Sequence, residues 1–292
     1  MIAPPATSNT NTAIAVGTSV GFKLLKAEEY ADAVEGLGAD IVLGLGDVPF
    51  GRTLGSKRVE KATDRSIDWL QGHVARRKKL AAQDGFKGQA QLFAPLLPLS
   101  CANQQYYIDC LAEDLRNDIS GLAIYSADTL GDLPEELATL PRLDLTEPAT
   151  PLEVLRQIAN GIDIVTMPFI SAVTDAGIAL DFEFPGPSTD SSKILPLGID
   201  LWSASHATDL GPLRKGCSCY ACTDHHRAFL QHLLAAKEML GWVLLQVHNH
   251  HMIDRFFASI RSSIAAGTFE ACLLYTSPSP RDRTRSRMPS SA

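Results

Sequence analysis

The chain has 292 residues, of which 45% are hydrophobic and 20% are charged, and its formal net charge is −7. This composition suits one or two globular domains, gives no apolar run long enough to predict a membrane span, and argues against a strongly basic nucleic-acid-binding protein. The polar, proline-rich start, MIAPPATSNTNT, lacks the basic and apolar regions of a secretory signal, so the six cysteines predict a reducing, cytoplasmic location.

Helical and strand patterns alternate through the first half of the chain. Helical periodicity covers residues 26–37, 59–79, 106–116 and 151–160. Apolar, strand-like segments lie at residues 39–46, 89–97, 121–125, 143–145 and 161–167. Strands that alternate with helices of this length predict parallel βαβ units. Five such units are compatible both with an open doubly wound sheet and with part of a barrel.

Two groups of charged residues are candidate functional features. The run Arg76–Lys79 is a candidate basic patch, although a solvated helix face is the preferred interpretation. Asp181 and Glu183 alternate along a strand-like segment, and paired carboxylates are able to act as acid and base. We prefer a solvated strand face, with Phe182 and Phe184 turned inward.

Three cysteines within six residues, Cys217, Cys219 and Cys222, form the most specific motif of the chain. An odd number of thiols this close together does not suit a disulfide framework. Three thiolates and one imidazole match a closed tetrahedral Cys₃His zinc site. Because four protein ligands leave no open position, such a zinc ion would be structural and not catalytic. The alternative is a cluster of buried cysteines without a metal.

The residues alone leave the fourth ligand open. His248 follows the third cysteine after twenty-five residues, and a tight turn carrying three ligands needs a fourth from an element that folds back over it. Several other histidines lie nearby in the sequence, namely His225, His226, His232, His250 and His251.

The cysteine motif and the segments after it resemble the zinc-binding end of the tRNA-guanine transglycosylases. The agreement runs in order through residues 213–222, 227–234, 238–241 and 244–245 and the pair His248-Asn249. The spacing between the third cysteine and the histidine is the one that the family uses. The resemblance therefore selects His248 as the fourth ligand of one structural Zn²⁺, beside Cys217, Cys219 and Cys222.

The resemblance also implies a fold. Members of the family are (β/α)₈ TIM barrels with a zinc-binding insertion after the last strand. On that plan the α/β units of this chain supply the fourth to eighth strands, and the first three strands have no counterpart, so we expect the sequence to be a fragment. The expected domains are a polar N-terminal segment (1–20), a partial barrel (21–190), a zinc-binding module with a closing helix (191–270) and a tail (271–292).

The tail is dense in serine, proline and arginine and has no apolar period. It is either a disordered basic tail or translated vector or out-of-frame sequence. The second interpretation is favoured, because the change of composition interrupts a helical pattern.

The resemblance further indicates where chemistry would lie, because barrel enzymes carry it at the carboxyl ends of their strands. The nucleophilic aspartate of catalytic members corresponds, counted from Asp163, to Thr166, a hydroxyl without an evident base. The position of the purine-recognising aspartate falls on Gly46, with Asp47 next to it, and a recognition glutamine corresponds to Leu97. We therefore predict no catalytic residue in this chain.

The resemblance thus implies a non-catalytic subunit that forms a heterodimer with a catalytic subunit. Together they would exchange guanine for queuine at the wobble position of tRNA, in the cytoplasm and at the surface of the mitochondrial outer membrane. The predicted helices at 224–240 and 242–260 would supply an apolar surface for the partner.

Two alternatives remain open. One is an active transglycosylase that uses an unrecognised carboxylate. The other is a zinc-stapled interaction module without a role in tRNA modification. A basic surface near Arg214 and Lys215 would favour the tRNA-related subunit over the module.

Overall fold

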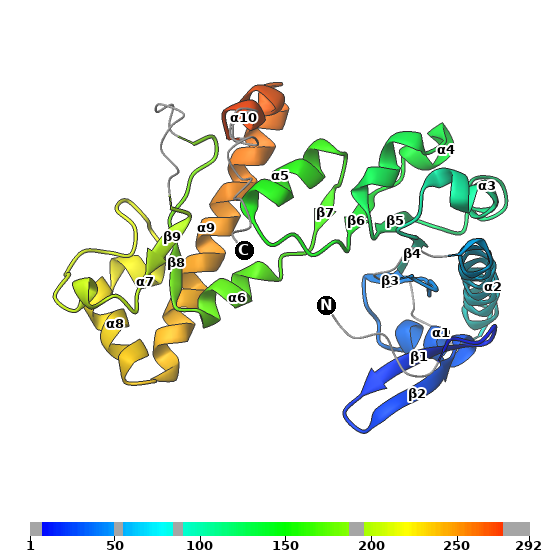
Figure 1. Cartoon of the computed structure of the whole chain (residues 1–292), viewed down its shortest axis with the longest axis horizontal. Coiled ribbons are helices and arrows are strands. Elements are labelled where there is room, and N and C mark those ends of the chain that lie inside the picture. The colour runs from blue at the N-terminus through cyan, green and yellow to red at the C-terminus, as the bar shows by residue number, and fades with distance from the viewer. Residues whose placement is uncertain (1–7, 50–54, 84–89, 187–195, 277–292) are drawn as a thin grey trace, which may run out of the picture. The chain divides into compact units, whose positions relative to one another are not determined.

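The computed structural model describes residues 8–49, 55–83, 90–186 and 196–276. The chain divides into two compact units, Met1–Glu147 with Arg156–Thr166 (unit 1) and Pro148–Leu155 with Met167–Ala292 (unit 2). Each unit is described by itself, and Figure 1 labels their elements. Within the described ranges, no helix has the length and apolar character needed to cross a membrane.

A five-stranded parallel sheet forms the centre of unit 1. The sheet order follows the chain, without the reversal that characterises a doubly wound sheet. The five strands are those predicted from the sequence, so the α/β class is confirmed. They are β3 (Ile41–Leu43), β4 (Gln91–Leu96), β5 (Gly121–Ile124), β6 (Arg142–Asp144) and β7 (Ile164–Val165).

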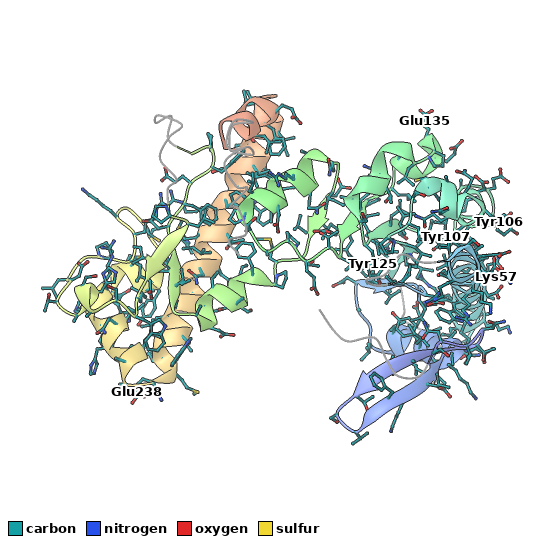
Figure 2. The ribbon with its side chains drawn as sticks, in the orientation of Figure 1. Lys57, Tyr106, Tyr107, Tyr125, Glu135 and Glu238 are labelled. Atoms are coloured by element: carbon teal, nitrogen blue, oxygen red, sulfur yellow. The ribbon has the colours of Figure 1, made fainter. Side chains whose placement is uncertain are left out.

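Helices separate these strands, and each packs through one apolar face. In α3, Tyr107 and Ile108 are buried in the main core while Tyr106 is 70% exposed. Figure 2 shows Tyr106 at the outer margin of the unit and Tyr107 inside it. The helices are α1 (Ala27–Gly36), α2 (Ser56–Ala81), α3 (Gln105–Glu113), α4 (Glu135–Ala138) and α5 (Pro151–Ala159), with 3₁₀ turns η1 (Cys101–Gln104) and η2 (Ala127–Asp132).

An antiparallel hairpin precedes the sheet, formed by β1 (Ala13–Thr18) and β2 (Gly21–Lys26). Gly21 has φ 107°, a conformation that suits glycine at the tight turn. The segment 1–20 that the sequence analysis separates from the barrel contains β1 in its described part. In β1, Ile14 and Val16 alternate with alanine and glycine, and the strand pairs with β2 along its whole length.

Unit 2 has a short antiparallel pair and a core of its own. Strands β8 (Ile178–Leu180) and β9 (Gly198–Asp200) pair, and the core includes Leu213, Leu234 and Leu245. The cysteines of the predicted metal site belong to the same core. The helices are α6 (Phe169–Asp175), α7 (Tyr220–Thr223), α8 (Arg227–Ala235), α9 (Met239–Ala265) and α10 (Phe269–Thr276), with a 3₁₀ turn η3 (Ala204–His206).

The boundary between α8 and α9 differs from the predicted break at Gly241. The chain turns at Lys237, which has φ 58°, and α9 begins at Met239. Gly241 lies inside α9, where a Cβ atom would stand 3.1 Å from the Cβ of Leu233. The glycine therefore permits a close approach of the two helices and does not end one. In the predicted tail, residues 271–276 belong to α10, and the rest lies outside the described residues.

Candidate metal centre

Three cysteines and one histidine converge in the core of unit 2. The ligand atoms of Cys217, Cys219, Cys222 and His248 all lie within 4.8 Å of one another, and all four residues are buried. The Sγ atoms stand 3.8, 3.5 and 3.4 Å from His248 Nδ1, in that order of residues. Sulfur and nitrogen ligands of a tetrahedral zinc ion lie about 3.5 Å apart, given the usual zinc–ligand bond lengths. The cluster could hold a metal ion, and its geometry is consistent with zinc.

The local backbone explains how one turn presents three thiols. Gly216 has φ 77°, which lets the chain reverse immediately before Cys217. The carbonyl of Cys219 then accepts hydrogen bonds from the N–H groups of Cys222 and Thr223 as α7 begins. This helical turn places Cys219 and Cys222 on the same side.

A backbone carbonyl of β8 fixes the orientation of the His248 ring. His248 Nε2 lies 2.9 Å from the carbonyl oxygen of Leu180, a distance that requires Nε2 to carry the proton and donate it. Nδ1 then keeps its lone pair and faces the three thiols. Metal-binding histidines usually have such a partner on the other ring nitrogen, which sets the tautomer.

The next residue, Asn249, holds the same strand. This fully buried side chain accepts a hydrogen bond from the Leu180 N–H at 2.8 Å. Its amide donates to the Ile178 carbonyl at 3.0 Å and to the Thr174 hydroxyl at 2.9 Å. Adjacent residues of α9 therefore bind both backbone groups of Leu180. No sequence pattern predicts these hydrogen bonds, and their only signal in the sequence is the His248-Asn249 pair.

We expect Asn249→Leu to lower metal affinity by about 10- to 100-fold, the usual effect of losing an outer-sphere partner. The leucine keeps a similar volume but cannot bind Leu180, so the carbonyl that orients His248 becomes free to shift. Competition with a chromophoric chelator measures the affinity. Gln246→Leu, on the same helix and outside this network, is the control. An affinity of the Asn249 variant within twofold of that control would contradict the prediction.

Burial sets the protonation of the ligands when no ion is bound. It raises the pKa of Cys222 to about 12 and also raises the pKa of Cys219. Burial lowers the pKa of His248. Cys219, Cys222 and His248 are therefore neutral at neutral pH, and a bound cation must displace the protons of the two thiols to form thiolates.

In unit 1, the positions that correspond to the nucleophile and to the base-recognition residues of catalytic members take part in packing and in hydrogen bonds within the fold. The Thr166 hydroxyl donates to the Asp144 carbonyl at 3.0 Å and so links the ends of β6 and β7. Leu97 is fully buried after β4. A Cβ atom at Gly46 would lie 3.1 Å from Pro95 and 3.3 Å from Leu97. Apolar packing therefore occupies the positions predicted for base recognition.

Asp47 is the carboxylate nearest to those positions, and it is completely buried in an ion-pair network. Arg58 binds both of its oxygens at 2.7 and 3.0 Å, and Arg65 binds one of them at 3.0 Å. Asn9 donates a further hydrogen bond at 2.7 Å, and the Asp47 N–H donates to Ser66 at 3.0 Å. These contacts indicate a structural role for Asp47. No pattern in the sequence indicates that these residues meet.

Arg214 is an ion-paired residue that links the carboxylates after β8 to the segment before the cysteine motif. It donates to the Phe182 carbonyl at 2.8 Å and forms ion pairs with Asp181 at 3.2 Å and with Glu183. Its side chain is only 11% exposed, so Arg214 does not contribute to a basic RNA-facing surface, although Lys215 is exposed. The two carboxylates are partners of Arg214 and not merely a solvated strand face.

The basic run at residues 76–79 is neither a free basic patch nor simply a solvated face. Three of its four side chains form ion pairs with acidic residues of unit 1, and two of these pairs join α2 to α1. A paired guanidinium has less capacity to attract phosphate than a free one. The pairs are Arg76–Asp32, Arg77–Glu35 and Lys78–Asp118.

Comparison with known proteins gives a consistent set of similarities. The family described as queuine tRNA-ribosyltransferase (TGT) matches residues 3–274. A protein of Schizosaccharomyces pombe named queuine tRNA-ribosyltransferase accessory subunit 2 is 38% identical over 91% of this chain, which spans 59% of that relative. Proteins of the same name from Xenopus laevis and Drosophila melanogaster are each 28% identical, over 91% and 90% of this chain and 73% and 64% of their own lengths.

Proposed function

Because the chain belongs to the queuine tRNA-ribosyltransferase family, we propose that it is a non-catalytic subunit of a heterodimer that exchanges guanine for queuine at the tRNA wobble position. The observation that carries this proposal is Thr166. Where a catalytic member is expected to have a nucleophilic carboxylate, this chain has a hydroxyl that donates to the Asp144 carbonyl. A hydroxyl without a base is a poor nucleophile.

The remaining parts of the proposal follow from the fold and the metal centre. The five parallel strands are proposed to be an arc of a (β/α)₈ barrel, which their unreversed order supports. The proposed ion is one Zn²⁺ held by Cys217, Cys219, Cys222 and His248, because soft thiolates and an imidazole in a closed tetrahedral set suit zinc. With four protein ligands, this ion would stabilise unit 2 and not activate water.

An apolar surface on unit 2 is the proposed contact for the catalytic subunit. On α9, Met239 is 81% exposed, Val243 55% and Val247 40%. Their four-residue spacing places them along one face of the helix. Buried leucines of α8 and α9, such as Leu234 and Leu245, belong to the core and leave this face uncovered within unit 2. Exposed apolar patches of this kind mark interaction sites.

Reconstitution with a catalytic subunit tests the proposal. We expect the two chains to co-elute in size exclusion at micromolar concentration, and labelled guanine to enter tRNA only when the catalytic subunit is present. Val243→Glu with Val247→Glu should weaken association by about 30-fold or more, because two charges would be buried at the contact. Ile264→Glu is the control, since it lies exposed on the same helix roughly 25 Å away at 1.5 Å per residue.

Two results would contradict this function. Incorporation of guanine by the chain alone, lost in Thr166→Ala, would indicate an active transglycosylase. A heterodimer that neither binds tRNA nor changes exchange would favour the interaction module. The cytoplasmic location, with a peripheral site on the mitochondrial outer membrane, is part of the proposal and is checked by cell fractionation.

A further inference from the structure

Unit 2 contains a cavity of about 240 Å³ that the proposed function leaves unused. One wall is the segment 182–185, which follows β8. The opposite wall is a face of α9, formed by Met252, Arg255, Phe256 and Ser259. The volume is below the roughly 300–1,000 Å³ of pockets for drug-sized ligands, so the cavity suits one ring system or one sugar phosphate.

The floor of the cavity is aromatic and well packed. Phe256 is 4% exposed and meets Phe182 edge to face, with ring centroids 5.3 Å apart. Phe184 is 5% exposed, and its centroid lies 6.0 Å from that of Phe256 and 6.0 Å from that of Phe269. Phe182 is the partly exposed ring of this group, so it is the ring that a planar ligand can contact, and Phe184 and Phe256 hold it in place with little loss of conformational entropy.

The two arginines that line the cavity differ in whether their guanidinium groups already have protein partners. Arg214 binds the Phe182 carbonyl, Asp181 and Glu183, and so it stabilises the segment that forms one wall. Arg255 is exposed, and no hydrogen-bond or ion-pair partner for it occurs among the described residues. Ser259 lies one helical turn further along the same face and likewise has no such partner in the described ranges. A guanidinium and a hydroxyl so placed suit an anionic oxygen group.

Glu183 restricts the chemical class of ligand, because a ligand in this cavity must place a hydrogen-bond donor near its carboxylate. It lines the same cavity, and its side chain is 54% exposed despite the ion pair with Arg214. A simple anion would meet this carboxylate without a compensating donor. A nucleotide carries a phosphate for Arg255, a planar base for the phenylalanines, and hydroxyl or amino donors for Glu183. A peptide with a C-terminal aromatic residue also offers an anion, a ring and N–H donors, so it is the competing ligand, and the proposed role in tRNA modification favours the nucleotide.

We propose that this cavity binds one nucleotide of the tRNA, with its phosphate at Arg255 and Ser259 and its base against the exposed part of Phe182. The inference rests on the proposed function, and it names a contact that the metal centre does not supply. According to this proposal, the RNA phosphate binds Arg255, which has no ion-pair partner among the described residues and lies beside Phe182. The ion-paired arginines of unit 1 and Arg214 do not bind it.

Fluorescence anisotropy of a labelled tRNA transcript, with the reconstituted heterodimer, tests the inference. We expect Arg255→Gln to weaken binding by about tenfold or more, the effect of losing a charge-assisted hydrogen bond, and to reduce the salt dependence by about one phosphate contact. Ser259→Leu should weaken binding similarly, because it fills the cavity without changing charge. Arg261→Gln, exposed on the same helix but outside the cavity lining, is the control.

The possible results distinguish a failure of the nucleotide-binding proposal from a failure of the proposed function. If Arg255→Gln and Arg261→Gln change affinity equally, or Ser259→Leu has no effect, the cavity does not bind a nucleotide and the inference is overturned. Arg255-dependent binding of an acetylated peptide with a C-terminal phenylalanine, with unchanged tRNA affinity, would replace the nucleotide by a protein ligand. A wild-type heterodimer that fails to bind tRNA would overturn the proposed function itself.

Discussion

Replacement of Cys219 with serine, or removal of the metal ion by a chelator, is expected to unfold unit 2. Cys217, Cys219 and Cys222 are part of its hydrophobic core, and His248 is fully buried among them. A structural zinc ion contributes on the order of 10 kcal/mol to folding, because the unfolded chain offers no preformed site. Without the ion, three thiols stay buried in the core, and no metal–ligand bonds offset the conformational entropy lost when they are ordered.

Circular dichroism and elemental analysis measure this effect. We expect one equivalent of zinc in the wild type, and loss of the thermal transition of unit 2 in Cys219→Ser or after chelation. Cys272→Ser is the matched control, because Cys272 lies in α10 and outside the cluster. Soluble, cooperatively folded protein that contains no zinc would contradict the prediction.

The same site is expected to bind metal more tightly as pH rises through the neutral range. Burial raises the pKa of Cys219 and Cys222, so these two thiols must lose their protons when an ion binds. Metal affinity therefore falls as pH falls, and binding acidifies a weakly buffered solution. Proton release in calorimetry, compared in two buffers of different ionisation enthalpy, gives the number of protons.

The second large effect is expected at Asp47. Replacing it with asparagine should lower the free energy of unfolding by about 2–3 kcal/mol, because the buried side chain loses its charge-assisted hydrogen bonds and the partly exposed Arg58 and Arg65 lose their counter-charge. Arg58 and Arg65 both depend on this carboxylate, which is completely buried. The changed residue keeps nearly the same shape, so the loss reports the charge and not a cavity.

Asp32→Asn is the control for Asp47, and urea unfolding measures both. Asp32 also pairs with an arginine, Arg76, but its side chain is 44% exposed. Exposed pairs of this kind contribute about 0–1 kcal/mol. If Asp47→Asn is as stable as the wild type and only weakens binding of a purine or tRNA, then Asp47 is a recognition residue and the structural assignment is wrong.

Local patterns in the sequence specified the units of this fold. Four of the five strands are short, mainly apolar runs next to a helical segment, β6 has only Leu143 as an apolar residue, and the parallel sheet follows from the alternation of strands and helices. The cysteine motif was equally predictable from the sequence, because one turn of backbone positions three ligands within six residues. The hairpin was missed, since neither of its strands carries a strong pattern without the other.

The fourth ligand shows what the tertiary structure decides. The residues alone left His248 among several histidines, and the resemblance to a family selected it. In the structure, α9 packs beside β8, and the Leu180 carbonyl binds the ring of His248 across 68 positions of sequence. That packing brings Nδ1 of His248 to the thiols.

Charged residues show most clearly the difference between what the sequence indicates and what the tertiary structure decides. The sequence shows Asp47, Arg76 and Arg214 only as charged residues, without their partners. Whether each one is buried, paired or free depends on partners 11 to 44 positions away, such as Arg58 for Asp47 and Asp32 for Arg76. A local pattern encodes which face of an element is apolar, and the packing of those faces then determines which charges meet. The sequence by itself therefore determined the elements and the cysteine turn, and the tertiary structure decided which polar groups are structural and which, like Arg255, remain available.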